Sequence, residues 1–223
     1  MNVHSDISII DKKAEQSNSL IKYFGILRFT FSEKSCIMFL LNFQRRISMQ
    51  INIRKACAGD LDAIAKIYDH IHTAEEQGQA CIGWIRGVYP ERSTAEAALV
   101  RGDIFIEEAD GKAVGTAIIN QLQVDTYADA PWEYDVPNNK VMVLHTLVID
   151  PFEKGCGFGR AFAEFYERYA LEHGCNYIRI DTNAKNAAAR SFYKKLGYKE
   201  IAVLPCVFNG IPDVNLVLLE KKI

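Results

Sequence analysis

The sequence predicts an α/β protein in which about seven strands and about four helices form a single domain. Apolar residues recur at period-two spacing in some segments and at helical spacing in others, and the two patterns alternate along the chain. Of the 223 residues, 49% are hydrophobic, which suits one complete core but would leave two domains cramped. One segment, residues 147–160, joins an apolar strand end to an amphipathic helix through a glycine-rich turn.

The domain opens with one strand and two helices. Ile51 and Ile53 alternate with polar neighbours and predict the first strand. The first helix is predicted from apolar residues at helical spacing, which are Leu61, Ile64, Ile67, Tyr68 and Ile71. An aromatic, glycine-broken linker over residues 81–90 follows. The spacing of Ser93 and Glu96 then predicts a capping box that opens a short second helix.

A hairpin and a long strand come next. Residues 104–108 and 114–120 read as two strands, and Asp110 followed by Gly111 predicts the tight turn between them. A polar, aromatic loop then leads into a long strand over residues 140–149, which carries the glycine-rich turn at its end.

The last part of the chain alternates strand and helix. Beyond the helix that starts at the glycine-rich turn, we expect a strand over residues 177–181 and a helix from about 186 to 196. Two closing strands are expected over residues 198–203 and 214–220, separated by residues 205–212, which begin and end with proline.

Residues 1–48 do not share this pattern. They mix basic residues with aromatic ones, and no small-residue cleavage site follows an apolar core. Met49 stands directly before the first strand. We therefore expect residues 49–223 to form the domain, and residues 1–48 to be a poorly structured extension that lies upstream of a biological start at Met49. The alternative is a targeting or partner-binding arm.

Composition argues against several classes of function. The net charge is −2 with both signs interspersed, so no nucleic-acid partner is expected. The six cysteines are scattered without paired Cys or His spacing, which predicts neither a metal site nor a disulfide framework. A reducing cytoplasm is the predicted compartment. The longest apolar run of the first fifty residues, residues 36–41, is too short to span a bilayer, and we expect no membrane association.

The glycine-rich turn has the features of an anion-binding site. Gly155, Gly157 and Gly159 lie at or just before a helix whose apolar residues are Phe158, Phe162, Phe165, Tyr166 and Tyr169. The first amides of a helix lack intrahelical acceptors and carry partial positive charge. Glycines allow such a turn to press its amides against a bulky anion. A diphosphate is therefore the expected ligand.

Three kinds of diphosphate site compete. The spacing G-x-G-x-G is one residue too short for a dinucleotide fold, and Arg160 and Ala161 stand where a Walker-type loop needs Lys and Ser or Thr. The third kind fits. A strand, a proline-containing turn, a basic residue and G-x-G-x-G resemble the coenzyme A loop of the GNAT superfamily of N-acetyltransferases. Lys154 departs from the Arg or Gln usual at the first loop position, yet it is still a cation that binds phosphate.

A second stretch resembles the other signature of this superfamily. Its residues, in the expected order, are Asn186, Ala189, Phe192, Tyr193, Leu196, Gly197 and Tyr198. Because both signatures occur with the right order and separation, residues from about 50 to 223 are identified as a member of the GNAT superfamily. The resemblance implies a mixed, mostly antiparallel twisted sheet that splays between its central strands, and acetyl-CoA as co-substrate without a metal.

The resemblance also assigns the contacts to acetyl-CoA. Backbone groups of Leu147, Val148 and Ile149 would pair with the pantetheine arm, and Asn186 would orient it. The pyrophosphate would lie on a loop made of Lys154, Gly155, Cys156, Gly157, Phe158, Gly159 and Arg160. Cys156 is interpreted as loop filler and not as a nucleophile. Three or four charge-assisted hydrogen bonds of ~1.5–3 kcal/mol each account for most of a micromolar affinity, about −8 kcal/mol.

Acetyl transfer to an amine needs a proton acceptor, donors for the developing oxyanion and a proton donor for the departing thiolate. By resemblance, Tyr193 occupies the position of that proton donor. A core aromatic on an amphipathic helix is the alternative for Tyr193, although Phe192 beside it already suits that role. A strand amide near Leu147 is the expected oxyanion donor.

Two residues compete as the general base. Asp181 lies at a strand end, where some relatives carry an acidic residue that works through water, but it could also be a turn carboxylate. His145 has an unperturbed pKa near 6.5, which suits proton acceptance, but it could also be a hydrogen-bonded structural residue. Strand alternation places His145 on the face opposite Leu144 and Thr146.

The acceptor pocket is expected between two variable segments, residues 81–90 and 131–135. Side chains there that could hold a cation by aromatic faces and a carboxylate are Trp84, Tyr89, Trp132, Glu133 and Tyr134. The two tryptophans could instead only cover the edge of the core.

Together these features predict an N-acetyltransferase that moves the acetyl group of acetyl-CoA to a small-molecule amine or amino-acid-like acceptor, by direct attack in a ternary complex. One alternative is a protein lysine or N-terminal acetyltransferase, which needs an open peptide groove. Another is a non-catalytic acyl-CoA-binding module that serves regulation. The resemblance also allows a homodimer, since dimers are common among relatives.

Overall fold

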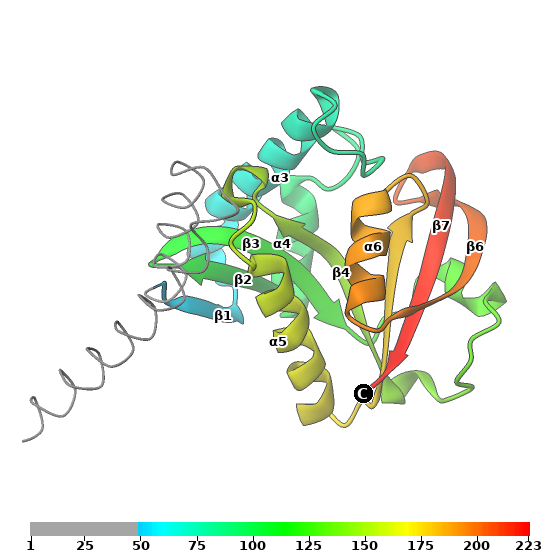
Figure 1. The fold of residues 1–223 in the computed structure, drawn as a ribbon. Coiled ribbons are helices and arrows are strands. Elements are labelled where there is room, and N and C mark those ends of the chain that lie inside the picture. The colour runs from blue at the N-terminus through cyan, green and yellow to red at the C-terminus, as the bar shows by residue number, and fades with distance from the viewer. Residues whose placement is uncertain (1–48) are drawn as a thin grey trace, which may run out of the picture. The chain divides into compact units, whose positions relative to one another are not determined.

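The computed structural model describes residues 49–223, and the predicted extension over residues 1–48 lies outside this range. The described part folds into the α/β domain that the sequence predicts (Figure 1). Its strands and α-helices are, in chain order, β1 (Ile51–Lys55), α3 (Leu61–Glu76), α4 (Arg92–Arg101), β2 (Ile104–Ala109), β3 (Lys112–Asn120), β4 (Val141–Ile149), α5 (Phe158–Glu172), β5 (Tyr177–Asn183), α6 (Ala187–Lys195), β6 (Lys199–Phe208) and β7 (Ile211–Lys222).

The strands form one mixed sheet in the order β1-β2-β3-β4-β5-β7-β6. β4 and β5 run parallel because α5 connects them, and the other neighbouring pairs are antiparallel. The β2–β3 hairpin turns at Asp110 and Gly111, whose φ angles are 50° and 79°. This confirms the turn predicted from the Asp-Gly pair.

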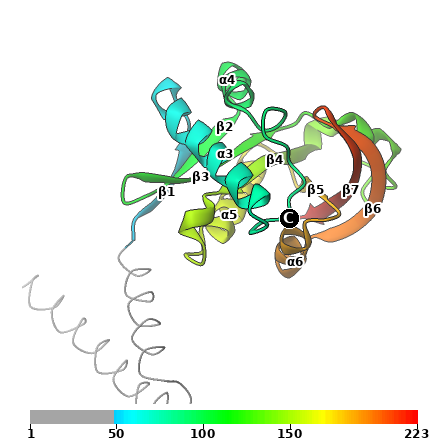
Figure 2. The same cartoon turned by 90° about the horizontal axis from the view of Figure 1, so that it is seen from above.

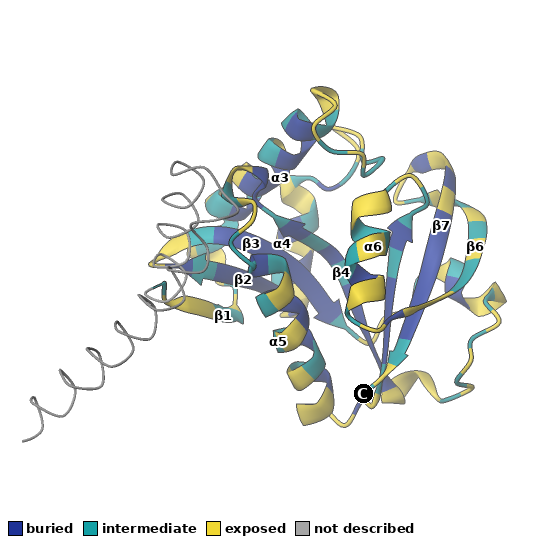
Figure 3. Cartoon of the chain, in the orientation of Figure 1, coloured by how far each residue is buried: buried dark blue, intermediate teal, exposed yellow. Residues whose placement is uncertain are grey.

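Helices cover both faces of the sheet (Figure 2). α5 and α6 pack on one face, where Phe162 and Leu144 are buried in the same cluster. α3 and α4 pack on the other face, where Ile64 is buried with Ile106. Figure 3 shows that the buried residues follow the central strands and the sheet-facing sides of the helices. Each helix is therefore held through its apolar stripe, as the helical spacing in the sequence predicts.

The sheet splays between β4 and β5. These strands pair from Val141–Tyr177 to Leu144–Ile180, and the pairing stops there although β4 continues for five residues and β5 for three. Backbone groups at the ends of both strands therefore face a gap instead of a neighbouring strand. This confirms the splay that the family resemblance implies, and it places an opening in the middle of the sheet.

A β-bulge on β4 lies beside this gap. The register of β3 with β4 shifts between Ile118–His145 and Thr116–Val148, and Thr146 has a positive φ of 51°. Leu144 packs on the α5 face, whereas the Thr146 side chain reaches the hydroxyl of Tyr89 on the opposite side. The prediction that Thr146 shares the face of Leu144 was wrong, because the extra residue of the bulge breaks the alternation.

The cap of α4 also differs from the prediction. Glu91 is the N-cap, with extended backbone, and its amide donates to the Thr94 hydroxyl at 3.0 Å. Glu96 instead pairs with Arg92 one turn earlier, at 2.9 Å. The helix was predicted correctly but the Ser93–Glu96 capping box was wrong, because the helix starts directly after Glu91.

The closing strands are longer than predicted. β6 and β7 meet in a tight hairpin at Asn209 and Gly210, whose φ angles are 48° and 83°. Pro205 lies within β6, opposite Asn215, and not in a connecting segment. β6 is an edge strand, so a proline that cannot donate a backbone hydrogen bond is tolerated there.

Candidate active site

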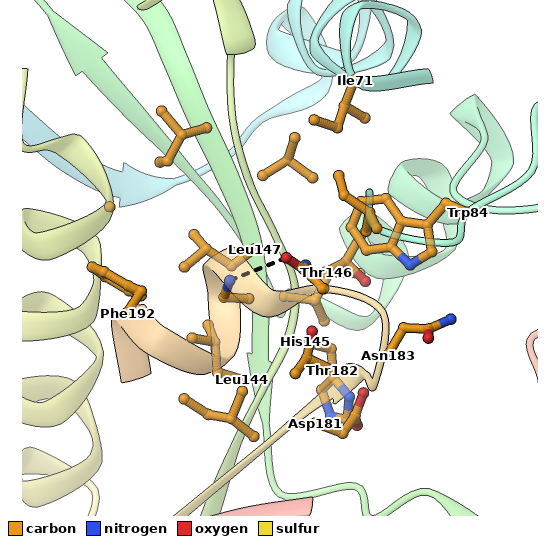
Figure 4. A pocket seen from close by; sticks show the side chains of 18 of the residues that line it. Ile71, Trp84, Leu144, His145, Thr146, Leu147, Asp181, Thr182, Asn183 and Phe192 are labelled. Atoms are coloured by element: carbon orange, nitrogen blue, oxygen red, sulfur yellow. Dashed lines mark hydrogen bonds between the residues drawn. The ribbon is translucent and has the colours of Figure 1, made fainter. Parts of the chain in front are cut away.

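A cavity of about 1130 Å³ occupies the gap between β4 and β5 and continues over the turn that precedes α5. Its walls come from the ends of β4 and β5, the first turn of α5, α6 and the linker between α3 and α4. Figure 4 shows Leu147 and Phe192 on one side of the opening, with Trp84 and Asn183 across from them. The cavity therefore joins the predicted diphosphate loop to the predicted acceptor segment.

The glycine-rich turn has the backbone geometry of an anion site. Gly155 and Gly157 have φ angles of 82° and 90°, values that residues with a Cβ adopt reluctantly. Gly157 is the N-cap of α5, and its carbonyl accepts the amides of both residues 160 and 161. Within residues 49–223, the amides of Phe158 and Gly159 have no acceptor. Two donors at the positive end of the helix are therefore available to an anionic ligand.

The start of this turn is anchored to α3. The Asp150 carboxylate, which is buried, lies 3.0 Å from Nδ1 of His70 and accepts the amide of Phe152 at 3.0 Å. The His70 ring also meets Phe152 edge-on, with centroids 4.7 Å apart. These contacts fix where the chain leaves β4, and they position the loop relative to the cavity.

All but one of the predicted cofactor-binding residues line the cavity. Those that line the cavity are Leu147, Val148, Ile149, Lys154, Gly155, Gly157, Phe158, Gly159, Arg160, Asn186 and Tyr193. The structure does not place Cys156 on this lining. Asn186 is the N-cap of α6, and its side-chain oxygen accepts the amide of Ala189 at 3.0 Å.

Asp181 lies at the first position beyond the last β4–β5 pair. The Tyr127 hydroxyl donates to Oδ2 of Asp181 at 2.9 Å. Burial raises the pKa of Asp181 to about 6, and the hydrogen bond from Tyr127 acts in the opposite direction. The carboxyl group can therefore change its protonation state near neutral pH while it lines the cavity.

His145 lies beside Asp181 on the neighbouring strand. Leu144 and Ile180 pair directly, so the next residue on each strand points to the opposite face of the sheet from α5 and α6. Nε2 of His145 lies 3.1 Å from both the Asn120 side-chain oxygen and the Leu122 carbonyl. Both partners are acceptors, so Nε2 carries the proton and Nδ1 keeps a lone pair.

The orientation of Asn120 supports this tautomer. Its NH₂ group donates to Asp103 at 2.8 Å, and its oxygen also accepts the amide of Leu122 at 2.8 Å. Burial lowers the pKa of His145 to about 4, so the ring is neutral at physiological pH. Of the two predicted bases, Asp181 has the pKa closer to neutrality, while His145 is a neutral hydrogen-bond acceptor.

Tyr193 is buried on the inner side of α6, where it packs edge-on against Phe192 and Tyr198 at centroid distances of 5.1 and 5.5 Å. Within residues 49–223 its hydroxyl makes no hydrogen bond, and the residue lines the cavity. Burial raises the pKa of Tyr193, so the phenol keeps its proton at neutral pH. It is therefore both a packed aromatic and a proton-bearing group at the gap.

The linker between α3 and α4 forms the far wall. Glu75 on α3 accepts the amides of Ile82 and Gly83, at 2.6 and 2.9 Å. Trp84 and Tyr89 line the cavity, and the Tyr89 hydroxyl bonds to Thr146 at the bulge. Hydrogen bonds thus hold the linker at both ends, and Trp84 and Tyr89 lie at the gap, where their role in acceptor binding stays a prediction.

The second predicted acceptor segment lies elsewhere. Trp132, Glu133 and Tyr134 do not line the cavity. The guanidinium of Arg179 lies 3.9 Å from the centre of the Trp132 ring and 3.0 Å from the buried carboxylate of Glu220. Glu220 also accepts the amides of Glu133 and Tyr134. The loop that carries Trp132 is therefore held against the sheet by the buried Arg179 and Glu220 pair.

Several residues of the site carry no sequence signal. Tyr127 precedes Asp181 by 54 positions, and nothing in its polar loop indicates the contact. Phe208 and Asn209 reach the cavity from the β6–β7 hairpin. Thr146 could have been found only if the bulge had been foreseen.

The described residues contain no helix that is long and apolar enough to cross a membrane. Residues 49–223 also bring together no group of three or more His, Cys, Asp and Glu side chains that could hold a metal ion.

The comparison with known families agrees with this geometry. The family model for the acetyltransferase (GNAT) family matches residues 61–198, which is more than half of the chain. The protein therefore belongs to the acetyltransferase (GNAT) family and is an acyltransferase.

Relatives and solved structures extend the match. The chain is 25% identical over 170 residues to the N-acetyltransferase MJ1530 of Methanocaldococcus jannaschii, covering 76% of this chain and 91% of that protein. The chain is also 28% identical over 100 residues to the N-acetyltransferase MJ1207 of the same organism, and this match covers 45% of this chain and 40% of that protein. A GNAT-family acetyltransferase structure from Streptococcus agalactiae covers 78% of this chain and 95% of its own, with a TM-score of 0.65 and 20% identity.

One further neighbour was solved with a ligand. YncA of Salmonella typhimurium, solved with its cofactor acetyl-CoA, covers 77% of this chain and 93% of its own, with a TM-score of 0.54 and 20% identity. At these identities the structural likeness shows the fold.

Proposed function

We propose that the protein transfers the acetyl group of acetyl-CoA to a primary amine of a small molecule, by direct attack while both substrates are bound. The observation that carries the proposal is one continuous cavity that is lined by Phe158 and Gly159 at the start of α5 and by the carboxyl group of Asp181. The first end suits a diphosphate, and the second suits an amine.

The residues present fit acetyl-CoA. The amides of Phe158 and Gly159 and the side chains of Lys154 and Arg160 would hold the pyrophosphate at the positive end of α5. The edge of β4 that β5 leaves open, from residue 147 to 149, would pair with the amide groups of the pantetheine arm. When bound, acetyl-CoA supplies an activated acetyl thioester at the gap.

The chain then provides the proton transfers. Asp181 accepts a proton from the ammonium group, directly or through water, and the neutral amine attacks the thioester carbonyl carbon. A β4 amide near Leu147 faces the charge that develops on the carbonyl oxygen. As the carbon–nitrogen bond forms and the carbon–sulfur bond breaks, the Tyr193 hydroxyl gives its proton to the sulfur.

A screen of primary amines tests the proposal. Free-thiol release from acetyl-CoA is followed with a thiol reagent, and the acetylated amine is identified by mass spectrometry. We expect release that depends on both enzyme and amine. Acetyl-CoA binding without release by any amine or peptide would instead favour the regulatory module. Release with peptides alone would favour a protein acetyltransferase.

A further inference from the structure

The acceptor end of the cavity is lined mainly by apolar and aromatic side chains. Trp84, Tyr89 and Phe208 form a continuous aromatic row, with edge-on ring centroids 5.8 and 5.7 Å apart. Aliphatic residues complete this lining, and they are Ile82, Val124, Val214 and Leu216. Such a surface recognises a ligand by area and shape, and it gains most from an apolar body.

The charges at this end are few. Among the described residues that line it, the acidic, histidine and basic side chains are Asp181, His145 and Arg101. His145 is neutral at physiological pH. Nε and one terminal nitrogen of Arg101 donate hydrogen bonds to the two carboxylate oxygens of Asp103, at 2.8 and 3.2 Å. This ion pair therefore has no net charge. Asp181 is left as the negative charge that faces the acceptor.

Asp181 and the aromatic row line the same cavity, and Asp181 lies beside His145 on the neighbouring strand. The Tyr89 hydroxyl is held by Thr146, which directly follows His145 on β4. A ligand cation at Asp181 therefore has an aromatic surface on the side of Tyr89.

We propose that the acceptor is a primary amine on an aromatic or bulky aliphatic body that carries no carboxylate, with its ammonium group at Asp181 and its body against Trp84, Tyr89 and Phe208. This inference rests on the proposed function and narrows it. An amino acid would bring a carboxylate toward Asp181 without an uncommitted cation to meet it. A polyamine would place its second charge among apolar side chains.

Matched pairs of acceptors test the proposal in the full chain with saturating acetyl-CoA. Phenethylamine is compared with phenylalanine, and tryptamine with tryptophan, because each pair differs only by the carboxylate. We expect kcat/KM to be about 100-fold or more higher for each amine than for its amino acid, since a buried unpaired charge is costly. Spermidine should be a poorer acceptor than phenethylamine.

Two variants locate the contact. Trp84→Ala and Phe208→Ala should raise KM for phenethylamine by roughly tenfold or more and leave KM for acetyl-CoA unchanged, because each removes a large apolar contact. Val207→Ala is the matched control, since Val207 is the neighbour of Phe208 on β6 and is 71% exposed. The control should leave both constants unchanged.

The outcomes distinguish a failure of the acceptor assignment from a failure of the proposed acetyltransferase function. Equal kcat/KM for tryptamine and tryptophan, or a preference for spermidine, overturns the inference and leaves the proposed function intact. Unchanged KM for phenethylamine in both aromatic variants also overturns it. Failure to acetylate every amine and amino acid, with acetyl-CoA still bound, overturns the proposed function and this inference together.

Discussion

Replacing Asp181 with Asn should remove most of the catalytic power. Burial raises the pKa of Asp181 to about 6, so the carboxylate form makes up about 90% at pH 7 and about 10% at pH 5. If that carboxylate accepts the proton of the amine, its titration alone lowers kcat/KM about tenfold between these pH values. Asp181→Asn should lower kcat/KM at pH 7 by roughly 100- to 10,000-fold, which is the usual contribution of a general base.

The assay is a pH profile of kcat/KM for wild type and variants. Protonation of the amine adds the same slope to every profile, so the ratio of wild type to variant isolates the enzyme group. The Asp181→Asn profile should lack the bend near pH 6. The hydrogen bond from Tyr127 stabilises the carboxylate form of Asp181. Tyr127→Phe removes this bond, so the pKa of Asp181 should rise and the bend should move to higher pH.

His145→Gln serves as the control. The pKa of His145 is lowered to about 4, so its titration lies outside the range of the bend, and this variant should keep the bend near pH 6. The assignment of Asp181 is refuted if Asp181→Asn retains both the bend and wild-type kcat/KM. A bend that disappears only in His145→Gln would transfer the role to the histidine.

Two further predictions follow from buried polar groups. Tyr193→Phe should keep acetyl-CoA affinity and lower kcat roughly 100-fold or more, because the proton donor to the sulfur is lost; wild-type kcat in this variant would remove the assignment. Glu107 is fully buried in β2, its carboxylate has no hydrogen-bond partner among residues 49–223, and burial raises its pKa to about 8. The folded state therefore keeps a proton that the unfolded state releases above about pH 4.5, so the free energy of unfolding should fall between pH 4.5 and 8, by up to about 1.4 kcal/mol per pH unit. Urea unfolding at pH 5 and 7.5 should show this loss in wild type and a smaller one in Glu107→Gln; equal losses would contradict the account.

The parts of the fold that were predictable depend on local sequence. The Asp110–Gly111 turn follows from the residues themselves, and so does the helix that begins after Gly157, because glycine chemistry and apolar spacing act over a few residues. The family signatures added the splay between β4 and β5, which no local pattern in the chain reveals.

The parts that were not predictable depend on distant contacts. The bulge at Thr146 reverses the strand alternation, and it shows only in the register with β3. The bond from Tyr127 to Asp181 joins a loop to a strand end 54 residues away. Trp132 was predicted to contact the acceptor, but its ring instead makes a cation–π contact with Arg179. Sequence spacing could not indicate this pairing.

The most direct test of the account is calorimetric titration of the folded protein with acetyl-CoA. The central claim is that the amides at the start of α5 and the open edge of β4 hold a pyrophosphate and its attached arm. The account predicts one site per chain with a dissociation constant near micromolar, about −8 kcal/mol. Absence of binding heat with both acetyl-CoA and CoA, at several temperatures, would contradict it.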